Sequence, residues 1–157
     1  MNALPTFHST EFSLTASDVE RIITGFEQGT LPKAEWTHAA HLVMAMWYAL
    51  HLPESELLSH IRPRIRAYNL AVGVENTTTS GYHETLTVFY IHVVVRFLKE
   101  FLAREITLQS PETLINALLQ SECARREYPL RFYTKERLFS SEARTEWLPP
   151  ENALGGE

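Results

Sequence analysis

Apolar residues recur at helical spacing along most of this chain, and in two stretches they cover nearly every face of the helix. Residues 39–50 are apolar apart from His41, and residues 88–98 are apolar on most faces. A helix that is hydrophobic on all sides must be covered by other helices, so the two stretches predict a central pair. The sequence contains no hairpin turn dipeptides and no paired strand patterns. The pattern therefore predicts an all-α fold.

Capping residues divide the chain into helices. Ser17 followed by Asp18 predicts the start of the first helix, and Gly29 predicts its end. The second helix is expected to begin either at Pro32 or after Thr37 as its cap. Later starts are predicted at Pro53, after Ser80 as the cap of a helix from about Tyr82 to Arg104, and at Ser110, with a helical turn over residues 134–139.

The length of the chain predicts one domain. Its 157 residues are enough for one hydrophobic core without disulfides or a structural metal. We expect a single-domain helical bundle of about five to six helices, two of them central and apolar. Residues 1–16 and 148–157 are expected to be loosely ordered.

Composition and charge limit the partners. A net charge of -5 argues against nucleic-acid binding, because proteins that bind phosphate backbones usually carry a basic excess. The longest strongly apolar run, residues 88–95, is shorter than the roughly 20 residues that span a membrane. The single cysteine, Cys123, forms no intramolecular disulfide, which suits a reducing compartment. We therefore expect a cytoplasmic protein with a small-molecule ligand or substrate; the composition leaves its oligomeric state open.

Three of the seven histidines lie at the predicted starts of the two most apolar helices. His38 and His41 are three residues apart, so on a helix both imidazoles reach one point. His83 and Glu84 are expected in the first turn of their helix, where the helix dipole opposes protonation of His83 and favours an ionised Glu84. If the two apolar helices run parallel, both pairs lie at the same end of the bundle. This spacing predicts one composite site.

The other four histidines do not join this predicted site. His92 lies nine positions after His83, which places it on the opposite side of a helix, and we expect it to be a core histidine with its hydrogen bonds satisfied. His51 and His60 are expected to be solvated, and His8 lies in the loose N-terminal segment.

The segments that contain these residues resemble a family of small bacterial proteins. Residues 36–42, Trp-Thr-His-Ala-Ala-His-Leu, are similar to a Thr-His-x-x-His-Leu segment of that family. Residues 81–87, Gly-Tyr-His-Glu-Thr-Leu-Thr, are similar to its Tyr-His-Glu-Thr-Ile-Thr segment, and residues 133–144 are similar to the tail of some members. The resemblance implies that His38, His41, His83 and Glu84 belong to one site, and it implies no particular reaction.

The first functional hypothesis is a metal-binding enzyme that hydrolyses a small molecule. His38, His41 and His83 would hold a divalent metal such as Zn, Fe, Ni or Mn, because these metals accept imidazole nitrogen. A coordination position would remain for water or substrate. Glu84 would act as a fourth ligand or as the catalytic general base on metal-bound water.

The alternative hypothesis is a metal-free binding module. The histidines and Glu84 would then form a buried polar pocket for a small organic acid. Only Lys33, Lys99 and Lys135 are lysines, so arginine supplies most of the positive charge and could bind the carboxylate. A third interpretation is purely structural, with the histidines stabilising helix ends.

Overall fold

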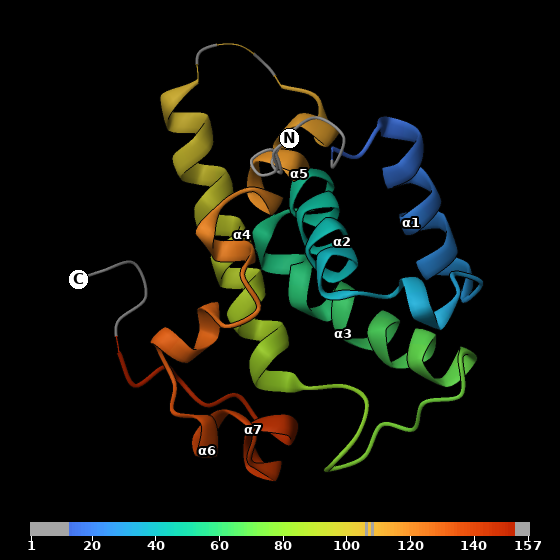
Figure 1. Ribbon diagram of the computed structural model, residues 1–157, viewed down its shortest axis with the longest axis vertical. Helices are drawn as coiled ribbons and strands as arrows, with labels where there is room; N and C mark the ends of the chain where they lie inside the picture. The colour runs from blue at the N-terminus through green and yellow to red at the C-terminus, as the bar shows by residue number, and fades with distance from the viewer. Residues whose placement is uncertain (1–12, 106, 108, 153–157) are drawn as a thin grey trace, which may run out of the picture.

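The computed structural model describes residues 13–105, 107 and 109–152, and all regular structure in them is helical (Figure 1). Its α-helices are α1 (Ala16–Gln28), α2 (His38–His51), α3 (Glu54–Ala71), α4 (Glu84–Arg104), α5 (Pro111–Leu119), α6 (Lys135–Leu138) and α7 (Ser141–Thr145). This arrangement confirms the predicted all-α, single-domain bundle and adds the short helix α7. None of the described helices combines the length and the apolar character needed to cross a membrane.

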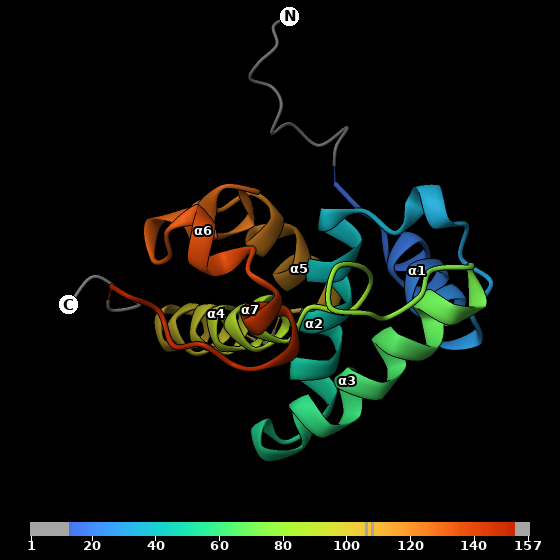
Figure 2. The same ribbon diagram turned by 90° about the horizontal axis from the view of Figure 1, so that it is seen from below.

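Helices α2 and α4 form the centre of the bundle, as predicted. They make the most extensive contact of any two elements, and α2 also packs against α1, α3 and α5. Val43 and Met46 of α2 and Val94 of α4 are fully buried. Figures 1 and 2 show that α2 crosses α4, so the expectation of a parallel pair is wrong.

Side-chain caps fix the helix ends that shape the site. Thr37 caps α2, and its hydroxyl accepts a hydrogen bond from the amide of Ala40 at 3.2 Å. Thr15 rather than Ser17 caps α1, in a reciprocal capping box with Asp18. Gly29 ends α1 with a positive φ of 72°, as predicted.

The start of α4 differs from the prediction. The helix is capped by His83, not by Ser80, and begins at Glu84. Gly81, with φ of 78°, turns the chain after Ser80, and the side chain of Asn76 accepts a hydrogen bond from the amide of Tyr82 at 3.0 Å. The backbone therefore enters the helix three residues later than the Ser80 cap would allow.

A C-terminal segment, residues 128–152, packs against α4 and forms a second, smaller core. Phe89 and Val93 of α4 contact Phe132, Tyr133 and Leu138 there. This segment carries α6 and α7 across the N-terminal half of α4 (Figure 2). It thereby brings residues from late in the sequence to the same region as the start of α2.

The stretches expected to be loosely ordered lie partly outside the described residues, which begin at 13 and end at 152. Within the described part, the amide of Leu14 donates to the side chain of Asn116 at 2.9 Å. At the other end, the amide of Leu148 donates to the hydroxyl of Thr85 at 3.0 Å.

The prediction of a core position for His92 is wrong. This residue is exposed on α4, and its ring lies edge-on to Trp147 with the centroids 5.5 Å apart. It lies outside the lining of the cavity between α2, α3 and α4, at a position where α4 faces solvent.

Candidate functional site

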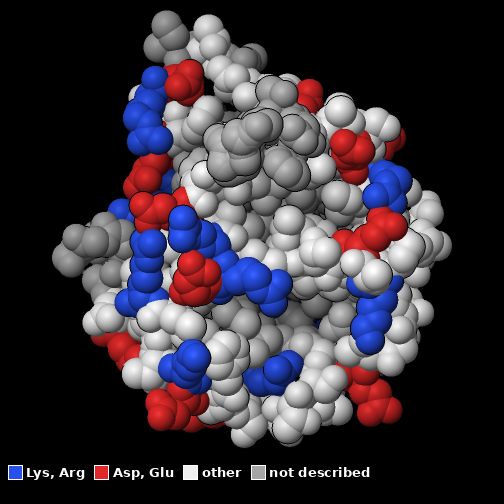
Figure 3. Space-filling view, in the orientation of Figure 1, with Lys and Arg blue, Asp and Glu red and all other residues white. Residues whose placement is uncertain are grey.

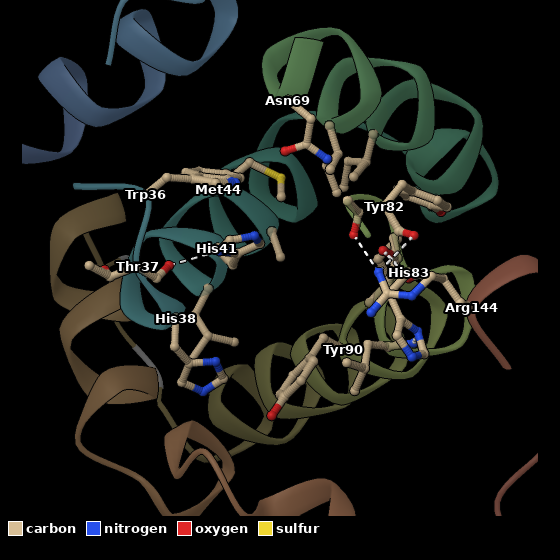
Figure 4. A pocket seen from close by; sticks show the side chains of 18 of the residues that line it. Trp36, Thr37, His38, His41, Met44, Asn69, Tyr82, His83, Tyr90 and Arg144 are labelled. Carbon is tan, nitrogen blue, oxygen red and sulfur yellow. Dashed lines mark hydrogen bonds between the residues drawn. The ribbon is translucent and has the colours of Figure 1, made fainter. Parts of the chain in front are cut away.

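A cavity of about 490 Å³ lies between α2, α3, α4 and the C-terminal segment. Small-molecule sites commonly occupy about 300–1,000 Å³, so the cavity has the size of a ligand pocket. Its aromatic lining consists of Trp36, Tyr82, Tyr90 and Phe139, with aliphatic side chains from the three helices between them. His38, His41 and His83 also line it, so the structure brings the three predicted histidines to one cavity (Figure 4).

His41 is held rigidly on the α2 side of the cavity. Its Nδ1 lies 2.8 Å from the carbonyl oxygen of Thr37, one turn earlier. Its ring packs on Trp36 with the centroids 4.0 Å apart, and Trp36 in turn stacks on Phe26 of α1. Burial lowers the pKa of His41 to about 4, so the imidazole is neutral near pH 7.

His38 lies about one turn before His41 on α2 and lines the same cavity. Its Nε2 lies 2.9 Å from the carbonyl oxygen of Ala124, so Nε2 carries the proton and donates. Burial lowers the pKa of His38, and the nearby charge of Arg126 acts in the same direction. The residue is therefore neutral near pH 7, and its Nδ1 keeps an acceptor lone pair.

His83 uses both ring nitrogens to hold the structure together. As the cap of α4, its Nδ1 accepts a hydrogen bond from the amide of Leu86 at 3.1 Å. Its Nε2 donates to the carbonyl oxygen of Leu138 at 3.0 Å, which ties α6 to α4. A metal ligand needs a free lone pair, and these two bonds leave none on His83.

Glu84 is likewise engaged within the protein. Its carboxylate forms an ion pair with Arg62 of α3 and accepts a hydrogen bond from the hydroxyl of Tyr82 at 2.7 Å. Tyr82 lines the cavity, and Glu84 lies behind it, outside the cavity lining. The proposed catalytic residue is thus placed next to the cavity wall and is not exposed in it.

Two arginines also line the cavity, and the histidine pattern alone does not reveal them. Arg144 of α7 donates from Nη1 to the carbonyl oxygen of Gly81 at 2.8 Å. Arg126 is exposed, makes no hydrogen bond or ion pair with the described residues, and its charge acts on His38 and Tyr90. Figure 3 shows Lys and Arg side chains beside a hollow on the face seen in Figure 1, with Asp and Glu side chains interspersed among them.

A sequence signal for Arg144 does exist. It lies next to Ala143 in residues 133–144, the tail stretch whose resemblance to a protein family is an expectation from the sequence alone. Its distance from the histidines along the chain leaves it out of the predicted site, because only the docking of the C-terminal segment on α4 brings it to the cavity.

In the part of the chain that the structure describes, no three His, Cys, Asp or Glu side chains are grouped as metal ligands. Among the described histidines that line the cavity, the imidazole nitrogens with a lone pair free of protein hydrogen bonds are Nδ1 of His38 and Nε2 of His41, and both residues belong to α2. The predicted metal centre at His38, His41 and His83 therefore stays a prediction, which the bonding of His83 does not favour.

Comparison of the chain with known protein families, with curated proteins and with solved structures gives no match.

Proposed function

We propose that the protein binds a small organic acid with an apolar body in this cavity, without a metal. The observation that carries the proposal is the charge of the lining. Arg126 and Arg144 line the cavity, and no Asp or Glu of the described residues does so, although the whole chain carries a net charge of -5. An acidic chain that presents only positive charge in its cavity is suited to an anion.

Arg144 is the residue expected to hold the carboxylate. Carbonyl oxygens fix its Nη1 without cancelling its charge, because a carbonyl is a neutral acceptor. The remaining N–H groups of its guanidinium are free to bind an anion, and Figure 4 shows the side chain reaching into the cavity. Burial lowers the pKa of His38, His41 and His83, so all three are neutral near pH 7 and the arginines supply the charge of the described lining.

The rest of the lining supports an organic ligand over an inorganic anion. Aromatic and aliphatic side chains such as Trp36, Tyr90, Leu42 and Ile65 form most of the wall. Burying apolar ligand surface against such a wall contributes about 25 cal/mol per Å² of area removed from water. Inorganic phosphate would gain none of this stabilisation.

Thermal shift and calorimetric titration with aryl monocarboxylates test the proposal. Benzoate, phenylacetate and naphthoate should raise the melting temperature, whereas their uncharged amides and inorganic phosphate should not. Arg144→Gln should abolish the shift, and Arg144→Lys should keep part of it, because lysine retains the charge but not the planar fork.

Arg125 and Arg126 offer a matched pair of variants. Arg126 lines the cavity, while Arg125 is its exposed neighbour, paired with Glu127 at 3.4 Å and outside the lining. Arg126→Gln should weaken carboxylate binding, and Arg125→Gln should not. Equal binding of acids and amides, or stabilisation by divalent metals alone, would overturn the proposal.

A further inference from the structure

We infer that the ligand of this cavity also carries a hydroxyl group, at the end of its apolar body opposite the carboxylate, and that Nε2 of His41 accepts the hydrogen bond from it. This inference rests on the proposed function, because it assumes that Arg144 holds a carboxylate. It narrows the ligand class from organic acids to hydroxy acids with the two groups far apart.

The acceptor character of His41 follows from its hydrogen bond to Thr37. A carbonyl oxygen can only accept, so the Nδ1 that lies 2.8 Å from the Thr37 carbonyl must carry the proton. In a neutral imidazole the other nitrogen, Nε2, is then an acceptor. Nε2 makes no hydrogen bond with any described residue, and Figure 4 shows the ring of His41 facing the cavity.

Both the position and the protonation state of Nε2 of His41 are fixed by its surroundings. The ring is held between its bond to Thr37 and its packing on Trp36, so Nε2 has one direction in which to accept. Burial lowers the pKa of His41, which keeps Nε2 unprotonated at neutral pH. A ligand group at this position that is itself only an acceptor would leave two lone pairs facing each other without a proton.

The charge of the cavity decides which donor fits. An ammonium group is a donor, but Arg126 and Arg144 line the same cavity and no described carboxylate there would offset a further cation. A hydroxyl donates without adding charge. Figure 4 places His41 and Arg144 on opposite sides of the cavity, so one rigid ligand meets both only if its hydroxyl and carboxylate are at opposite ends.

Calorimetric titration with matched aryl acids tests this inference. The probes are phenylacetate, its para-hydroxy and para-methoxy derivatives, and its ortho-hydroxy isomer. The para-hydroxy acid should bind about tenfold more tightly than the unsubstituted acid, as one well-placed hydrogen bond allows. The methoxy and ortho-hydroxy acids should gain nothing.

A close structural copy of His41 on the same helix supplies the control. Nδ1 of His51 also lies 2.7 Å from the carbonyl oxygen four residues earlier, that of Trp47. Its ring packs on the ring of Trp47 with the centroids 4.1 Å apart. However, His51 is exposed and does not line the cavity. His41→Phe should remove the preference for the para-hydroxy acid, and His51→Phe should leave it intact.

The outcomes separate the two proposals. Binding of all the aryl acids with equal affinity overturns this inference and leaves the proposed function standing. Binding of none of them overturns both. Should His41→Phe fail to fold, nuclear magnetic resonance of isotope-labelled histidine in the wild-type protein decides: the Nε2 signal of His41 must move with the para-hydroxy acid and not with phenylacetate.

Discussion

The guanidinium of Arg62 holds the carboxylate of Glu84 by two hydrogen bonds, from Nε to Oε1 at 3.0 Å and from Nη2 to Oε2 at 2.5 Å. Burial raises the pKa of Glu84, but the bonds from Arg62 and Tyr82 outweigh it, so the pKa is lowered overall and the carboxylate stays ionised. The pair joins the middle of α3 to the first residue of α4 and holds Tyr82 as part of the cavity wall.

We predict that Glu84 stabilises the fold and performs no chemistry. Glu84→Gln leaves Arg62 without its counter-charge, and the pair is partly buried, with side-chain exposures of 35% for Arg62 and 11% for Glu84. The expected loss is about 1–3 kcal/mol, between the values for exposed and for buried pairs. Urea denaturation measures it.

The exposed ion pair of Glu100 with Arg96 provides the comparison, because the distance from Arg96 Nε to Glu100 Oε2, 2.9 Å, is similar to the 3.0 Å from Arg62 Nε to Glu84 Oε1. Glu100→Gln should change the unfolding free energy by less than about 0.5 kcal/mol. Unchanged stability of Glu84→Gln, combined with loss of ligand binding or turnover, would instead favour the original interpretation of Glu84 as a catalytic base.

A second prediction concerns His83 as the cap of α4. His83→Ala removes the acceptor for the Leu86 amide and the donor to Leu138, and should cost about 1–2 kcal/mol. His83→Asn should recover about half of the loss, because asparagine is a favourable N-cap. Melting temperatures compare the two variants, and an Asn variant no better than Ala would contradict the capping role.

A third prediction is a loss of stability in mild acid. Burial lowers the pKa of His41 from 6.5 to about 4, so the unfolded chain binds a proton in this range and the folded protein does not. Stability should be constant above pH 6.5 and fall as the pH drops from 6.5 to 4, by about 3 kcal/mol at about 1.4 kcal/mol per pKa unit.

His38 and His83 add to this loss with the same sign, because burial lowers the pKa of both. Denaturation curves recorded across the range measure the slope. His41→Phe should flatten it, whereas His51→Phe should not; an equal slope in wild type and His41→Phe would show that His41 is not the titrating group.

A fourth prediction concerns the turn before α4. A Cβ at Gly81 would lie 2.4 Å from the carbonyl oxygen of Glu75, in addition to its positive φ. Gly81→Ala should therefore cost about 2 kcal/mol or more and weaken ligand binding, because the Gly81 carbonyl anchors Arg144. Gly73 has a similar φ of 86°, but a Cβ there would meet no atom within 4 Å. Gly73→Ala is therefore expected to lower the unfolding free energy by about 1 kcal/mol and to leave ligand binding normal.

The fifth prediction is the metal content of the untagged protein. With His83 using both ring nitrogens, we expect less than one divalent metal per chain, and no change in His38→Ala. Elemental analysis by mass spectrometry checks this. One equivalent of metal that is lost in both His38→Ala and His83→Ala would restore the three-histidine centre.

The two central helices could be predicted because the apolar runs that form them are local patterns, whereas the meeting of His83 with His38 and His41 at one cavity depends on how α2 and α4 pack. The apolar runs around Met46 and Val94 identified the buried pair, and Thr37 and Gly29 are ordinary helix signals. His38 and His41 were placed together by their spacing on one helix, and this placement did not depend on how α2 and α4 cross.

The chemistry of the site could not be read in this way because it depends on contacts between distant residues. Which nitrogen of His83 is free depends on Leu138, and whether Glu84 is available depends on Arg62. Arg144 reaches the cavity only through the packing of α7 on α4. Single-sequence periodicity contains no information on these partners.

The packing of the C-terminal segment on α4 also means that the two walls of the cavity are synthesised at different times. During synthesis the wall that carries His41 is made early, and the guanidinium of Arg144 emerges from the ribosome among the last of the described residues. A nascent chain would therefore have the proposed acceptor, His41, long before it has the proposed anion-binding group, Arg144. The site that we propose would form only once α7 has docked on α4, and an acid bound there would in turn hold that segment against local unfolding.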